Sequence, residues 1–584
     1  MNSLKSVIYR ILPILQIMFG LIWLSDLALT DSYFSIYVLV AFFSFYLILR
    51  NPECRDMAVA KVKIGVLFLS FIFSVLVLLA NYPLYTTIGD PALISRSTSL
   101  LMNVIDGFWG LIGGICISYP VFRFFFDSFP SNVRTIRINT WEKYLPVLMF
   151  VSIAGLYLIH LFFVEYPGNV TEDSFSQIAE MLSGHYSNFN TYWHTRLFQA
   201  VLTFGYCLFS DINASIALFC LLQAVVMAFA FTYCLMTMRR YGVSGWFIVL
   251  AWAAYAILPY HMALSITVWK DVLFAGTCLL IVSSILRIIY CLSHKQWFDY
   301  VVLIFGSILF FLSRTNGWMI YFITAIIFGV FLYKNKRLFA LMSVLAVLGW
   351  FLLNPALSML HVDGGDKVES LSIPIQQVSR VISEGKELTD EEIELLERVI
   401  DLEEVPELYV EWISDPMKVE LRSKDYQYFL THFDEYRDLW IRLGMRYPWE
   451  YVKAWVEQTK GYWNLGYPYG QYSETITDNP YGAEKSGGNN ILAVLFRLYF
   501  GFSRHLIFFE PLHSIGLHIW IVMLCFLLNA IKKRRHFIIA VPYLILVAGL
   551  WLGTPVYACF RYIYPLFAAF PLILSTALWE PVNK

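Results

Sequence analysis

Two neighbouring carboxylates, Glu172 and Asp173, lie in the stretch EYPGNVTEDSFSQ (residues 165–177), directly after an apolar run. A carboxylate within hydrogen-bond reach of a hydroxyl serves as a general base. The loop predicted over 166–196 also carries three further polar or aromatic candidates: Gln177, Trp193 and His194. The sequence therefore predicts that this loop supplies catalytic and substrate-binding groups, with either acid as the base.

Three other short stretches place charged or polar groups at the ends of apolar runs. They are TVWKD with Lys270 and Asp271, SRTNGW with Arg314, and YACFRYIYP with Arg561 and Tyr562. Lysine and arginine bind phosphate and neutralise the charge that develops on it. A carboxylate base beside several fixed cations suits a reaction in which a hydroxyl loses a proton while a phosphate departs.

Each of these groups also has a structural interpretation. Glu172 or Asp173 can cap or begin a helix, a role for which Thr171 competes. A single histidine such as His194 is often held by hydrogen bonds in a folded region. Lysine or arginine at the edge of a membrane span extends to the interface or binds lipid head groups. We expect the four stretches to act together only if they lie on one side of the membrane.

The composition predicts a multi-pass membrane protein. Of 584 residues, 58% are hydrophobic, 18% aromatic and only 15% charged, and the mean hydropathy is +0.61. The net charge of -1 gives no basic excess, which argues against a nucleic-acid partner. Nine cysteines without CxxC or Cys/His spacing predict neither a disulfide framework nor a metal site.

A span needs roughly 20 apolar residues, and short basic loops stay cytoplasmic. Fourteen spans are predicted, over 8–29, 33–50, 64–81, 102–126, 145–165, 213–238, 245–260, 267–290, 300–313, 317–333, 338–356, 514–530, 537–553 and 558–578. Both termini are then cytoplasmic, and the four polar stretches lie on the outer face of the plasma membrane. This holds only if 197–210 is interfacial or re-entrant, because its crossing would move Lys270 and Asp271 to the other side. The segment 491–510 is predicted as an in-plane amphipathic helix.

Four regions follow from these patterns. Residues 1–144 form an N-terminal four-span module, and 145–356 form a membrane core. Residues 357–490 contain 26 acidic and 13 basic residues and are predicted to be an outer, mainly helical domain. In that domain, Thr389 and Glu392 have the spacing of a capping box. Residues 491–584 comprise the interfacial helix and the last three spans.

The ordered motifs YPGNVTEDSFSQ, His194-Thr195, WKDVLF, SRTNG and FRYIYP resemble the GT-C superfamily of polytopic glycosyltransferases. This superfamily includes the protein O-mannosyltransferases and the lipid A aminoarabinose transferases. SIPIQQVSRVISEGKELTDEE (residues 372–392), followed by DPMK and GYW, is similar to a bacterial membrane family within it. The similarity extends over about 145–578. It implies an all-α polytopic membrane fold with a GT-C-like core and an outer helical domain.

The resemblance also assigns roles to particular positions. Asp173 matches the acid proposed as base, with Glu172 as the rival, and Asp271 matches an acid at the outer end of a later span. The donor phosphate is expected at Lys270, Arg561, Arg314, His194 and Tyr562, and substrate contacts are expected at Gln177, Trp193, Gln376 and Gln377. One departure is the segment FNTYWHT, where relatives often carry a His-Pro pair. No cofactor is expected to be required. A divalent metal, which related oligosaccharyltransferases need, is an open alternative rather than an expectation.

The sequence thus favours an inverting membrane glycosyltransferase. Because no soluble nucleotide sugar is available outside the cell, we expect a polyprenyl-phosphate-linked sugar as donor, with its lipid tail in the bilayer, and an outer-surface glycan or glycolipid as acceptor. Two alternatives from other classes are a transporter or flippase of lipid-linked glycans and a non-catalytic scaffold for envelope assembly.

Overall fold

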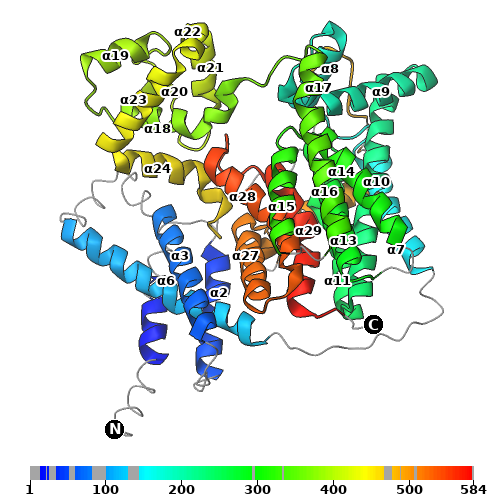
Figure 1. Cartoon of the computed structure of the whole chain (residues 1–584), viewed down its shortest axis with the longest axis horizontal. Coiled ribbons are helices and arrows are strands. Elements are labelled where there is room, and N and C mark those ends of the chain that lie inside the picture. Colours follow the sequence, from blue (N-terminus) through cyan, green and yellow to red (C-terminus); the bar gives the residue numbers. More distant parts are fainter. Residues whose placement is uncertain are drawn as a thin grey trace.

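The computed structural model describes residues 13–21, 23–24, 34–50, 60–81, 100–128, 144–292, 296–331, 335–465, 476–486, 488, 490–505 and 509–581 (Figure 1). Within these ranges every regular element is a helix, and extended backbone pairs only in isolated bridges. This agrees with the predicted all-α fold.

Eight helical segments of the described chain are long and apolar enough to cross a membrane. They are part of α6 (Leu100–Ser128), α7 with η2 (Leu145–Val164), α10 (Ile212–Tyr241), α13 (Lys270–Ile289), α14 (Gln296–Ser313), α16 with α17 (Lys336–Met359), η6 with α28 (Arg535–Gly553) and α29 (Phe560–Leu578). A ninth results if α11 (Gly245–Ile257) and α12 (Pro259–Ser265), bent by 51° to each other, cross together. The chain is therefore a helical, multi-pass membrane protein.

The larger number of fourteen spans stays a prediction. Four of the expected spans contain apolar helical stretches of 17 residues or fewer: parts of α2 (Phe34–Arg50) and α3 (Ala60–Asn81), and all of α15 (Gly317–Phe331) and α27 (Ile515–Ile531). Their composition is that of a span, whereas their length is short for a bilayer core of about 30 Å. Half of the span predicted over 8–29 lies outside the described residues.

Helix α13 is the central helix of the bundle. Of the 18-residue apolar stretch of this helix, 94% is buried inside the protein, more than in any other candidate span of the described chain. It packs against α10, α14 and α29. Its first two residues, Lys270 and Asp271, are therefore held at a fixed depth by the surrounding helices.

Helix α9 (Tyr192–Phe209) contains most of the segment 197–210. It is not among the helices apolar enough to cross, and in Figure 1 it lies across the end of the bundle beside α8 (Glu172–Ser183). Its first turns carry His194 and Arg196, which lower its hydropathy. Helix α25 (Ile491–His505) is a short amphipathic helix with exposed Ile491, Leu495 and Leu498, as expected for an in-plane element.

A second hydrophobic core lies in a helical unit at the end of the bundle where α8 and α17 lie (Figure 1). Its helices are α18 (Ser372–Ser383), α19 (Asp390–Glu397), α20 (Val405–Leu408), α21 (Asp415–Ser423), α22 (Tyr426–Thr431), α23 (Phe433–Arg446) and α24 (Pro448–Thr459). The capping box predicted for Thr389 and Glu392 is present at the start of α19. We call this unit the outer domain, after the side of the membrane predicted for it from the sequence.

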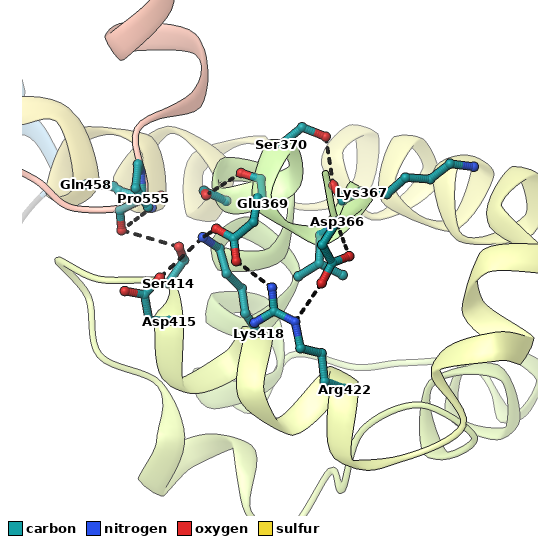
Figure 2. Close-up of polar contacts among 12 residues, drawn as sticks. Asp366, Lys367, Glu369, Ser370, Ser414, Asp415, Lys418, Arg422, Gln458 and Pro555 are labelled. Carbon is teal, nitrogen blue, oxygen red and sulfur yellow. Dashed lines mark hydrogen bonds and ion pairs between the residues drawn. The ribbon is translucent and has the colours of Figure 1, made fainter. Parts of the chain in front are cut away.

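The outer domain is hydrogen-bonded to the loop between α28 and α29. Ser414 and Gln458 both donate to the carbonyl of Pro555, each at 3.3 Å (Figure 2). Behind Ser414, Glu369 accepts from Lys418 at 2.8 Å and also pairs with Arg422. These ion pairs fix α21 in the domain, and α21 in turn fixes the loop.

Candidate functional site

The loop that carries the two acids is held by backbone pairing to the segment before α13. The amide of Asn169 donates to the Ile266 carbonyl (3.0 Å), and the amide of Val268 donates back to the Asn169 carbonyl (2.9 Å). The preceding Gly168 has a φ of +118°, and a Cβ there would lie 2.5 Å from Cys220 Sγ, so only glycine fits. This pairing sets the start of α8 beside the start of α13.

Helix α8 begins with Thr171 as its N-cap residue. Thr171 makes no side-chain cap bond and instead accepts from Trp269 Nε1 at 2.7 Å, while Ser174 donates to the Val268 carbonyl at 2.6 Å. Glu172 and Asp173 occupy the first turn, where the helix dipole favours negative charge. The N-cap position for which the acids were candidates therefore belongs to Thr171, which leaves both acids free of capping.

Arg561 lies in the first turn of α29, after a loop that is held on several sides. The Tyr462 hydroxyl accepts from the Cys559 amide at 3.1 Å and donates to the Val556 carbonyl at 3.2 Å. The Trp412 carbonyl accepts from the Tyr557 amide at 3.0 Å. The outer domain and the segment after α24 thus determine where Arg561 lies.

A charged cluster forms where α8, α13, α14 and α29 meet. Arg561 pairs with Asp173, and Arg314 pairs with Asp271 at 3.2 Å. The ring of Tyr562 lies between the two guanidinium groups, with its centroid 5.0 Å from Arg561 Cζ and 5.1 Å from Arg314 Cζ. Four residues predicted from separate stretches, together with Tyr562, are therefore joined in one arrangement.

Lys270 adds a third cation next to Asp271. Its ammonium donates to the carbonyl of Phe189 at 2.9 Å and lies 5.6 Å from the centroid of that ring. Among the described residues no carboxylate lies within ion-pair distance of it, unlike Arg314 and Arg561. Two of its three N–H donors are thus available to an anion.

The two carboxylates of the cluster differ in their surroundings. The Asp271 side chain is 2% exposed and its partner Arg314 is 17% exposed, whereas Asp173 is 39% exposed and Arg561 is 22% exposed. Asp271 is accordingly suited to hold Arg314 in place. Asp173 has access to solvent and to a substrate hydroxyl, as a base requires.

His194 and Gln177 lie in the corner between α8 and α9. Gln177 Nε2 donates to His194 Nδ1 at 3.0 Å and to the Asn190 carbonyl at 3.1 Å. Burial, with a smaller contribution from the charge of Lys270, lowers the pKa of His194 to about 3. A neutral His194 cannot neutralise phosphate charge, so its bonds favour the structural interpretation considered above.

The other predicted site residues lie outside the charged cluster. Glu172 is exposed, and no cation of the described chain is within ion-pair distance of it. Trp193 donates to the Leu352 carbonyl at 2.9 Å. In the outer domain, Gln376 donates to the carbonyl of Val410 at 2.6 Å, and Gln377 accepts from Trp440 at 2.8 Å. These side chains hold neighbouring elements together, and their assignment to substrate remains a prediction.

Two contributors to the cluster were not predicted from the sequence. The centroid of the Trp269 ring lies 5.2 Å from the Arg561 guanidinium, and the Phe189 carbonyl accepts from Lys270. Trp269 directly precedes the KD pair, so its place in TVWKD was an available signal. Phe189 acts through its backbone, which leaves no mark in the sequence.

Within the described residues no three or more His, Cys, Asp or Glu side chains are grouped to hold a metal ion. No curated protein and no solved structure matches the chain. Residues 182–582, more than half of the chain, match one family model, so Lys270, Asp271, Arg314 and Arg561 fall inside the match while Asp173 precedes it. The protein belongs to the family of unknown function DUF6020.

Proposed function

We propose that the protein is an inverting membrane glycosyltransferase that moves a sugar from a polyprenyl-phosphate donor to a glycan or glycolipid acceptor. The observation that carries this proposal is the pairing of Asp173 with Arg561 beside Lys270 and the Asp271–Arg314 pair. One partly exposed carboxylate and three cations at the end of a membrane bundle fit a base and a phosphate-binding site.

The reaction proceeds by in-line displacement at the anomeric carbon. The acceptor hydroxyl forms the new C–O bond on one face of the sugar, while the bond to the phosphate oxygen breaks on the other face. The acceptor proton passes to Asp173, and the bonding electrons leave with the polyprenyl phosphate. Lys270 and Arg561 neutralise the charge on that phosphate as it departs.

Arg561 has two roles in this scheme. Without donor it occupies the Asp173 carboxylate, so Asp173 accepts a proton only after Arg561 has turned to the phosphate. A phosphate offers Arg561 a charge-assisted, bidentate partner of the kind that guanidinium prefers. Donor binding therefore precedes activation of the acceptor.

The position of the cluster supports a lipid-linked donor. Lys270 and Arg561 lie at the start of α13 and α29, which are both candidate spans, so a phosphate bound there lies at the level where a polyprenyl tail enters the bilayer. The outer domain lies at the same end (Figure 1). We place this end and the domain on the outer face of the plasma membrane and both termini in the cytoplasm, following the distribution of basic loops.

The proposal is tested with the full-length protein in proteoliposomes, supplied with a polyprenyl-phosphate sugar whose sugar is radiolabelled, and with an extract of envelope glycans and glycolipids. The expected result is label in a glycan product together with free polyprenyl phosphate. Labelled donor that crosses the bilayer unchanged would indicate a flippase instead. Donor that neither reacts nor moves with wild-type protein would support a scaffold and contradict the proposal.

A further inference from the structure

The outer domain contains an apolar cavity of about 250 Å³ whose lining includes none of the residues of the charged cluster. Helices α18, α21 and α23 form most of its wall. The lining includes Ile375, Val378, Val399, Leu421, Phe429 and Leu439. The cavity is thus a separate feature of the domain.

The larger polar side chains of the lining are already bonded within the protein. Tyr436 donates its hydroxyl to the Leu395 carbonyl at 2.9 Å, and Trp440 donates to Gln377 at 2.8 Å. Arg437 is paired with two aspartates of its own helix. A polar ligand would lose its hydrogen bonds to water without gaining replacements, which is costly. The ligand that fits this wall is therefore a hydrocarbon.

The size of the cavity also favours an occupant. An apolar cavity of about 150 Å³ lined by leucine, isoleucine and phenylalanine excludes water and binds benzene. The destabilisation caused by an empty cavity grows with its volume. The larger cavity of the outer domain has room for several methylene groups in a row.

The bilayer is the nearest source of such a chain. The domain rests on membrane helices, because α18 packs against α28 and α24 packs against α3. Three apolar side chains on α23 and α24 of the domain are exposed: Ile441 (43%), Met445 (72%) and Trp449 (43%). Trp440 lines the cavity directly beside Ile441 on α23. Exposed apolar side chains mark surfaces that meet a membrane or a protein, and tryptophan is enriched at membrane–water interfaces.

We propose that this cavity binds one hydrocarbon chain of a bilayer lipid. The outer domain is then a lipid-binding domain in its own right, whether or not the protein transfers sugar. Helix α21 forms part of the cavity wall through Leu421, and its first turn follows Ser414, which binds Pro555 (Figure 2). The bound chain therefore lies one helix away from the loop that leads to Arg561.

The test uses full-length protein in nanodiscs that contain a phospholipid with a photoreactive diazirine near the end of one acyl chain. After illumination, the cross-linked peptides are identified by mass spectrometry. Cross-links are expected on α18, α21 and α23 of the outer domain in addition to the membrane helices. Their confinement to the membrane helices of the wild-type protein would overturn the proposal.

Two filling variants from different walls, Leu421→Trp and Val399→Trp, are expected to lower the cross-link yield in the outer domain at least tenfold. Val419→Trp is the matched control, because Val419 lies on the same helix as Leu421 but is 63% exposed; its yield should equal that of the wild type. Equal yields in all four proteins would also overturn the proposal.

Discussion

Asp173 and Arg561, 388 positions apart in the chain, form an ion pair at the end of the membrane bundle. Both side chains are partly exposed, and an ion pair of that kind contributes only about 1 kcal/mol or less to stability. Substitution of either residue should therefore change activity far more than folding. Because their substitution should affect activity without unfolding the protein, these two residues are the most direct ones to test by mutagenesis.

Asp173→Asn is expected to lower transfer from the lipid-linked donor by roughly 100-fold or more, the usual contribution of a general base, because the amide cannot accept the acceptor proton. Glu172→Gln is the matched control, since Glu172 is the neighbouring acid of the same helical turn and is exposed. Its rate should stay close to that of the wild type. The reverse pattern in initial rates would make Glu172 the base.

Arg561→Lys tests whether Arg561 exchanges Asp173 for the donor phosphate as its partner. Lysine keeps the positive charge but offers no bidentate contact, and the loss of one charge-assisted hydrogen bond corresponds to roughly a tenfold weaker interaction. We therefore expect KM for the donor to rise about tenfold, while KM for the acceptor changes little. A rise confined to the acceptor would place Arg561 away from the phosphate.

Substitution of Arg314 alone, and of Arg314 together with Asp271, tests the buried ion pair between them. Arg314→Gln leaves the buried Asp271 carboxylate without its partner, and such a loss costs about 3 kcal/mol. The double variant Asp271→Asn with Arg314→Gln removes both charges and should recover at least half of the loss. The unfolding temperatures of the wild type and of both variants are measured in detergent. If the single and double variants unfold alike, Arg314 does not stabilise Asp271.

The pH dependence of stability offers a test of the corner between α8 and α9. Because the pKa of His194 is lowered from 6.5 to about 3 in the folded protein, the unfolded chain binds one more proton between these two values. Stability should therefore fall as pH decreases below 6.5, by at most about 1.4 kcal/mol per pH unit for this group. Above that pH the group has no effect.

His194→Asn keeps an acceptor for Gln177 and removes the titration. The difference in unfolding temperature between this variant and the wild type should be constant above about pH 7 and should shift in favour of the variant towards about pH 4.5. Other buried histidines titrate equally in both proteins and cancel. A difference that does not change with pH would mean that His194 has the same pKa in the folded protein as in the unfolded chain.

The sequence was sufficient to predict that the four polar stretches lie near one another, because each borders an apolar run and the basic loops alternate regularly. It could not predict which charges pair. The Asp173–Arg561 contact depends on the backbone hydrogen bond between Asn169 and Ile266. It also depends on the hydrogen bond of Tyr462 to the loop before α29. Both are contacts between remote segments, and neither follows from hydropathy.

The sequence also could not separate substrate contacts from packing. Gln376 and Gln377 are predicted substrate contacts, and both side chains form hydrogen bonds inside the outer domain. Their contact with substrate stays a prediction. The number of spans was also difficult to predict from composition. Helices such as α15 and α27 are strongly apolar but short, and composition does not determine how many residues a helix contains.

The proposed placement of the charged cluster on the outer face predicts which engineered cysteines a membrane-impermeant maleimide will reach. Lys424 is exposed at the end of α21 in the outer domain, and Arg337 is exposed at the start of α16, near the opposite end of the bundle. In intact cells, Lys424→Cys should gain label above the wild-type background, whereas Arg337→Cys should gain it only after the membrane is permeabilised. Labelling of both positions in permeabilised cells controls for folding. If Arg337→Cys were instead labelled in intact cells and Lys424→Cys were protected, Lys270 and Arg561 would face the cytoplasm, and the donor would have to be sought on that side of the membrane.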